Sequence, residues 1–174
     1  MTTIKITKMN GCGNDFVIID KSEFDKANLS MSDMAKKICD RNFGVGGDGM
    51  IIPDLTPNNK TDIAWFFYNS DGSTAQMCGN GMRCFAKYVT DKKLVNKNKF
   101  SVMTGAGIIT PEILDNGLIK VNMSKPILEP EKIPFKGNNI LNFDITIKDI
   151  TLKANAISMG NPHCVIFTDN DVYE

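Results

Sequence analysis

The feature that most constrains the fold is one amphipathic helix set among short strands. This helix is predicted to begin near Cys78 or Gly79 and to continue to about Lys93. Four apolar residues recur on it at the spacing i, i+3, i+4 and i+7, namely Met82, Phe85, Ala86 and Val89. That spacing gives the helix a single apolar stripe, so one of its faces should lie against a hydrophobic core.

A second helix and several strands are predicted before it. Residues 30–40 favour a helix, because Ser30 and Asp33 have a spacing similar to a capping box and the apolar residues that follow share one face. Apolar–polar alternation and short apolar runs predict strands within residues 4–6, 16–20, 50–52 and 63–68.

The pattern changes after the long helix. Glycine-containing segments typical of hairpin turns separate three predicted strands, at 99–104, 107–113 and 118–123. A proline-containing stretch, 125–134, has the character of a linker. Three further strands are predicted beyond it, at 145–148, 151–157 and 164–167.

Two domains follow from this organisation. We expect residues 1–123 to form the first domain and residues 124–174 to form a linker and the incomplete start of a second. The sequence passes through Tyr173 and Glu174 without a helix that could cover the second sheet, so we expect a truncated chain.

Composition excludes several classes of function. Twenty basic and twenty acidic side chains balance, so charge gives no reason to expect binding to nucleic acid or to an anionic membrane. The sequence has no apolar signal segment and no apolar run near the roughly 20 residues of a membrane span, so a cytoplasmic location is expected. The five cysteines are irregularly spaced, which predicts free thiols in a reducing compartment. With one histidine and no Cys-x-x-Cys pair, no metal site is expected.

A glycine-rich segment, Gly44–Gly49, fits the dinucleotide fingerprint G-x-G-x-x-G. That fingerprint binds a pyrophosphate only when it follows a strand and opens a helix. Here the predicted helix comes before the glycines and the predicted strand comes after them. A tight backbone turn is therefore the favoured interpretation.

The segment with most chemical content surrounds Cys78. Small polar residues lead from the end of a predicted strand to this cysteine, which stands where a helix begins. Unpaired N–H groups and the helix dipole stabilise an anion there and favour the thiolate. Gly79 and Gly81 are poor helix formers, which fits a ligand such as a carboxylate that approaches the backbone closely. A buried structural cysteine before a glycine turn explains the local pattern equally well.

The other cysteines have simpler interpretations. Cys84, six residues further along the helix, is rotated by roughly 240° and displaced by roughly 9 Å from Cys78, so both cannot flank one small substrate. Cys84 is predicted to pack or to face a partner, and Cys39 to lie in the core. His163 and Cys164 are adjacent on a predicted strand and should point to opposite faces, so they are not a nucleophile–base pair.

Four asparagines stand in similar turn-rich segments next to strands or at the helix start. Each alone is most simply a turn former. Together they have the polarity to line a pocket for a zwitterion without adding charge; they are Asn14, Asn69, Asn80 and Asn161.

These segments together resemble motifs of the diaminopimelate epimerase family. Residues 10–16 resemble its opening motif, Gly44–Gly49 its glycine-rich turn, 69–84 the motif of its first catalytic cysteine, and 158–164 its Asn-Pro-His segment. The order and spacing match along essentially the whole chain. Cys12 is a departure, because an aliphatic residue is expected there.

The resemblance implies a fold and a reaction. The fold is α+β, with a mixed β-sheet wrapped around a central helix, as one of two pseudo-symmetric domains that have the active site between them. The reaction is epimerisation of LL-2,6-diaminopimelate to meso-diaminopimelate, for lysine and peptidoglycan precursor synthesis, without pyridoxal phosphate, another cofactor or a metal. An amino-acid substrate is then the expected partner, and a homodimer is one assembly to test.

The resemblance also implies roles for individual residues. Cys78 is one of two catalytic acid/base groups, and Gly79 and Asn80 bind the reacting α-carboxylate through backbone amides. Three asparagines hold the substrate's polar groups, namely Asn14, Asn69 and Asn161. His163 has a supporting role at the margin of the site. The family's second cysteine and its Glu-Arg pair have no match in this sequence, so we expect no epimerase activity from residues 1–174 alone.

Two other functions are compatible with parts of this sequence. A related two-cysteine racemase for proline, hydroxyproline or histidine would share the fold, and a panel of amino acids would discriminate it. A thiol redox or ligand-binding module would use Cys78 differently, but the sequence has no nearby resolving cysteine.

Overall fold

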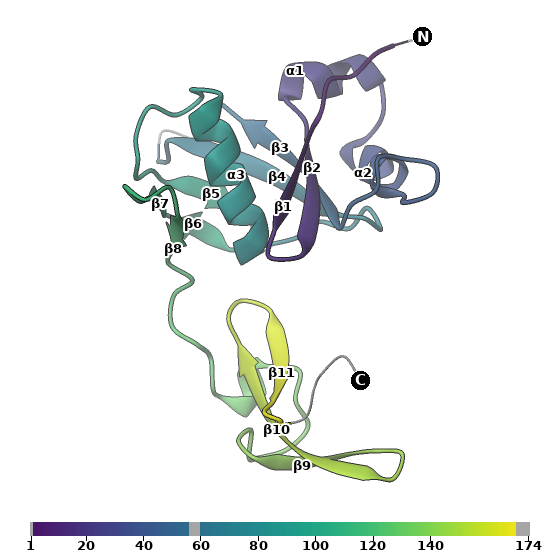
Figure 1. The fold of residues 1–174 in the computed structure, drawn as a ribbon, viewed down its shortest axis with the longest axis vertical. Coiled ribbons are helices and arrows are strands. Elements are labelled where there is room, and N and C mark those ends of the chain that lie inside the picture. The colour runs from purple at the N-terminus through teal and green to yellow at the C-terminus, as the bar shows by residue number, and fades with distance from the viewer. Residues whose placement is uncertain (1, 56–59, 170–174) are drawn as a thin grey trace. The chain divides into compact units, whose positions relative to one another are not determined.

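Six strands of mixed direction form the main sheet (Figure 1), in the order β1-β2-β3-β4-β5-β6. The computed structural model describes residues 2–55 and 60–169. The pairs β2/β3 and β4/β5 are parallel and the other neighbours are antiparallel. The strands are β1 (Thr7–Gly11), β2 (Asn14–Ile18), β3 (Gly49–Asp54), β4 (Ile63–Asn69), β5 (Val102–Thr104) and β6 (Gly107–Ile109).

One long helix, α3 (Gly79–Asp91), packs against β1 and β2 and lies in front of the sheet in Figure 1. Its predicted apolar stripe is buried in the core, together with Phe16, Ile18 and Ile51 from the sheet. A separate hairpin of β7 (Pro111–Ile113) and β8 (Ile119–Val121) packs against the same helix. The α+β fold of a mixed sheet around a central helix is therefore confirmed.

A second core lies on the opposite face of the sheet. Side chains alternate along the strands, so that Val17 and Met50 belong to this second core while their neighbours belong to the first. Helix α2 (Met31–Cys39) covers this face, and Ser30 caps it by accepting a hydrogen bond from the backbone N–H of Asp33. The predicted helix at 30–40 is confirmed.

Three parts of the sequence prediction are wrong in detail. The strand predicted within residues 4–6 is absent, because the first strand begins at Thr7. A four-residue helix, α1 (Lys21–Phe24), and a 3-10 turn, η1 (Asp25–Ala27), were not predicted, because one turn of helix is too short for a periodic apolar pattern. The predicted strand at 107–113 is divided into β6 and β7, which belong to different sheets. The break comes before Pro111, which has no backbone N–H for a sheet ladder.

The chain divides into two units, Met1–Asn122 and Met123–Glu174. The second contains a 3-10 turn, η2 (Pro130–Lys132), and an antiparallel sheet in the order β11-β10-β9. Its strands are β9 (Phe143–Ile147), β10 (Ile150–Ser158) and β11 (Pro162–Ile166). Tyr173 and Glu174, to which the expectation of a truncated chain refers, lie outside the described residues. Within 2–55 and 60–169, no helix has the length and apolar content needed to cross a bilayer.

Candidate functional site

Cys78 is the N-cap residue of α3. Its backbone is extended, with φ −146° and ψ 120°, and its sulfur accepts a hydrogen bond from the backbone N–H of Gly81 at 3.4 Å. Its carbonyl oxygen accepts the first helical hydrogen bond, from Met82 at 2.8 Å. Gly79 and Asn80 occupy the first turn, where backbone N–H groups have no partner within a helix. A half-buried thiol thus lies beside backbone donors that suit an anion.

A tight return after β4 brings the chain to this helix start. The backbone of Asn69 pairs with Gly49 at the end of β4, and the backbone N–H of Ala75 then donates to the carbonyl of Phe67 at 2.9 Å. The Asn69 side chain is exposed and donates to the hydroxyl of Ser73 at 3.0 Å. In the structure this side chain holds the turn, and its predicted contact with substrate stays a prediction.

Asn14 lies at the start of β2 and contacts the helix start directly. Its side-chain oxygen accepts a hydrogen bond from the side-chain nitrogen of Asn80 at 2.7 Å. Its own side-chain nitrogen donates to Asp48 at 2.9 Å. Two of the predicted site residues, 66 positions apart in the sequence, are therefore brought into contact.

The hairpin that carries Asn14 approaches α3 closely because Gly11 has no side chain. A Cβ at Gly11 would lie 3.0 Å from the carbonyl oxygen of Asn80 and 3.0 Å from the sulfur of Cys84. Cys84 itself is buried in the core, and burial raises the pKa of its thiol. Burial likewise raises the pKa of Cys39 to about 11. Both cysteines have the packing role expected of them.

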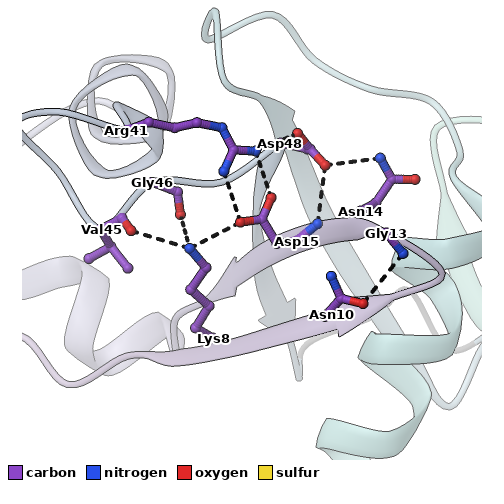
Figure 2. A network of polar contacts seen from close by, with 9 residues as sticks. All are labelled: Lys8, Asn10, Gly13, Asn14, Asp15, Arg41, Val45, Gly46 and Asp48. Atoms are coloured by element: carbon purple, nitrogen blue, oxygen red, sulfur yellow. Dashed lines mark hydrogen bonds and ion pairs between the residues drawn. The ribbon is translucent and has the colours of Figure 1, made fainter. Parts of the chain in front are cut away.

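The glycine-rich segment lies between α2 and β3, the reverse of the order that a dinucleotide fingerprint requires. It delivers a charged cluster beside β2 instead (Figure 2). Arg41 donates to both oxygens of Asp15, at 2.8 and 3.1 Å, and to Asp48 at 2.8 Å. Lys8 lies 3.0 Å from Asp15 and donates to the carbonyl of Gly46 at 2.8 Å. Hydrogen bonds from Arg41 and Lys8 hold the pKa of Asp15 well below its usual range.

Two residues at the site were not identified from the sequence, Asp48 and Arg83. Asp48 holds Asn14, and Arg83 donates through one nitrogen to the side-chain oxygen of Asn80 and to the sulfur of Cys12 at 3.2 Å. Charged residues beside glycines and on a helix surface are ordinarily solvated, so no local pattern distinguishes them.

Asn161 and His163 belong to the second unit. Asn161 lies in the turn between β10 and β11, and its side-chain oxygen is 3.2 Å from Nε2 of His163. Both side chains are exposed. His163 pairs with Ile157 and Cys164 with Ala156, as consecutive residues of β11. A shared site with Cys78 stays a prediction. In the described part of the chain, no three His, Cys, Asp or Glu side chains are grouped so as to hold a metal ion.

Comparison with known proteins identifies a family with a similar sequence. The model of a family described as diaminopimelate epimerase matches residues 6–129. A diaminopimelate epimerase from Carboxydothermus hydrogenoformans is 44% identical over 169 residues, which are 96% of this chain and 61% of that protein. Another, from Desulforapulum autotrophicum, is 46% identical over 175 residues, with the same shares of 96% and 61%. The chain thus spans about 61% of the length of these curated relatives.

Solved structures agree on the fold at much lower identity. A hydroxyproline epimerase from Agrobacterium vitis matches with a TM-score of 0.64 at 9% identity, over 92% of this chain and 50% of the other. A PhzF-family phenazine biosynthesis protein from Bacillus anthracis matches with a TM-score of 0.61 at 19% identity, over 95% of this chain and 56% of the other.

Proposed function

Because the chain belongs to the diaminopimelate epimerase family, we propose that the whole protein converts LL-2,6-diaminopimelate to meso-diaminopimelate. The observation that supports this most directly is the position of Cys78 at the start of α3. A sulfur at that position can exchange a proton with a substrate whose carboxylate is held by the neighbouring N–H groups.

The reaction inverts one α-carbon, so it needs two acid/base groups on opposite faces of that carbon. One group removes the α-proton as its C–H bond breaks, and the other delivers a proton to the opposite face as a new C–H bond forms. Cys78 supplies one group. The second comes from the remainder of the whole protein, as the family resemblance implies. The first-turn N–H groups of α3 stabilise the negative charge that develops next to the carboxylate.

The substrate-binding roles follow the same logic. Gly79 and Asn80 bind the α-carboxylate through backbone N–H groups, which donate and therefore suit an acceptor-only ligand. Three asparagines bind its remaining polar groups, namely Asn14, Asn69 and Asn161. His163 supports the site at its margin.

The test is exchange of the substrate's α-proton with solvent by the full-length protein in heavy water. Cys78→Ala is expected to abolish both exchange and epimerisation. Cys164→Ala is a matched control, because it removes an exposed cysteine that has no part in the proposed chemistry. Epimerisation at the normal rate by Cys78→Ala would contradict the proposal.

Substrate identity needs a separate measurement. We expect turnover of diaminopimelate and none of proline, hydroxyproline or histidine when each is supplied alone. Turnover of one of these three in place of diaminopimelate would make the protein a racemase of another specificity. Sedimentation of the same preparation tests the expected homodimer. Fractionation of cells that contain the protein tests the expected cytoplasmic location.

A further inference from the structure

Four side chains from three distant parts of the sequence form one hydrogen-bonded row at the site. Asn14 donates to Asp48 at 2.9 Å, Asn80 donates to Asn14 at 2.7 Å, and Arg83 donates to Asn80. All four residues are half-buried, so water competes with these bonds less than it does on the open surface.

The chemistry of the two ends fixes the orientation of both amides. An ionised aspartate only accepts hydrogen bonds and an arginine only donates them. Asn14 must therefore turn its nitrogen to Asp48, which leaves its oxygen for Asn80. Asn80 must turn its nitrogen to Asn14, which leaves its oxygen for Arg83. If both amides were flipped, an oxygen would face the Asp48 carboxylate and a nitrogen would face the Arg83 guanidinium.

Each end of the row is itself anchored. Asp48 accepts hydrogen bonds from Arg41 at 2.8 Å and from the backbone N–H of Asp15 at 3.1 Å, and Figure 2 shows these contacts on its two carboxylate oxygens. Arg83 also donates to Cys12 at 3.2 Å. The proposed chemistry gives the glycine-rich segment no role. In the row its role is to place Asp48, the acceptor that orients Asn14.

We propose that Asp48 and Arg83 are positioning residues that orient the amides of Asn14 and Asn80 so that each keeps one N–H for a substrate carboxylate. Each amide nitrogen has two hydrogens, and the row uses one of them. The remaining N–H lies on a group that cannot rotate without breaking the row. This inference rests on the proposed function, because it names the groups that the proposed substrate would meet.

The kinetic test uses the full-length protein and diaminopimelate as the probe. At the two ends of the row, Asp48 only accepts hydrogen bonds and Arg83 only donates them. Asp48→Asn and Arg83→Gln each replace one of these side chains by an amide that both donates and accepts. Each should raise KM about tenfold and change kcat much less, because an aligned contact to a carboxylate is lost in the ground state and transition state alike. Asp62→Asn and Lys87→Gln are matched controls, since both residues form ion pairs outside the row.

Double-mutant cycles separate positioning from general damage. In an Asn14→Ala background, Asp48→Asn should change KM by less than about twofold, because the group that it orients is gone. Arg83→Gln should likewise change KM by less than about twofold in an Asn80→Ala background. If the single effects instead multiply in the double variants, Asp48 and Arg83 do not act through the asparagines and the inference is overturned.

A measurement without substrate keeps this inference separate from the proposed function. The side-chain amide resonances of Asn80 should shift in Asp48→Asn, because Asn14 bonds to both residues and transmits the change. They should not shift in Asp62→Asn. Unchanged Asn80 resonances in Asp48→Asn would overturn the inference about the row, even if the enzyme is active. Shifted resonances in a protein that does not turn over diaminopimelate would support the row and count against the proposed function alone.

Discussion

The sulfur of Cys78 accepts a hydrogen bond from the backbone N–H of Gly81, and the 3.4 Å between these atoms makes it the cap of α3. The proposed acid/base group therefore also has a structural task. The two tasks have different chemical requirements, because capping needs any small acceptor while proton transfer needs a thiol.

Substitution of Cys78 should separate the two tasks. Cys78→Ser is expected to be at least as stable as the natural protein, because serine is a preferred N-cap, whereas Cys78→Ala should lose about 1 kcal/mol of unfolding free energy. Both variants should lack epimerase activity, because an alcohol is a far weaker acid than a thiol. Urea denaturation and α-proton exchange measure the two properties. Equal stability of the two variants would contradict the capping role.

The glycine-rich turn should be sensitive to a single methyl group at Gly44. A Cβ there would lie 2.2 Å from the carbonyl oxygen of Lys37 and 2.7 Å from that of Ile38, both in backbone that cannot move away easily. We expect Gly44→Ala to lower the free energy of unfolding by about 3 kcal/mol. In Gly47→Ala the nearest atom is 3.3 Å away, and the loss should be less than about 1 kcal/mol. Chemical denaturation of both variants is the measurement, and similar losses would contradict the steric argument.

The sequence predicts local features of this fold well, because their causes are local. The stripe from Met82 to Val89 predicts α3, and Ser30 marks the start of α2. The start of α3 at Cys78 is likewise predicted from the sequence. Each of these features follows from the spacing of a few residues or from the chemistry of one cap.

The row of polar contacts could not be predicted in the same way. Two of its three bonds join residues 34 and 66 positions apart, so they depend on the order of strands in the sheet and on the packing of α3. Nothing local indicates that Asp48 accepts from Asn14, or that Asn14 accepts from Asn80. The division of β6 from β7 has a similar origin, since the choice of partner strand at Pro111 is tertiary.

Cys12 occupies a strained position that another residue would fill better. It has φ 52° and precedes Gly13 with φ 92°, the positive values that a type I′ hairpin turn requires at both central positions. Asparagine tolerates this conformation, and Asn28 already adopts φ 50° in this chain. Cys12→Asn should raise the free energy of unfolding by about 1 kcal/mol, and Cys12→Val should lower it. Thermal unfolding of the two variants is the measurement, and a destabilised Cys12→Asn would show that the Arg83 contact outweighs the backbone strain.

Asp62 should make part of the stability depend on pH. Hydrogen bonds from Lys97 and then from Ser101 lower the pKa of its carboxyl from 3.8 to about 2. A carboxyl whose pKa is lower in the folded state stabilises the fold above its unfolded pKa, and this contribution is lost as the pH falls towards the folded pKa. The natural protein should therefore be more stable than Asp62→Asn at pH 6, and the difference should shrink between pH 4 and pH 2, over about that window. Lys97→Gln should show a smaller difference with the same sign. Urea denaturation across this range tests the linkage, and a difference between the natural protein and Asp62→Asn that stays constant with pH would contradict it.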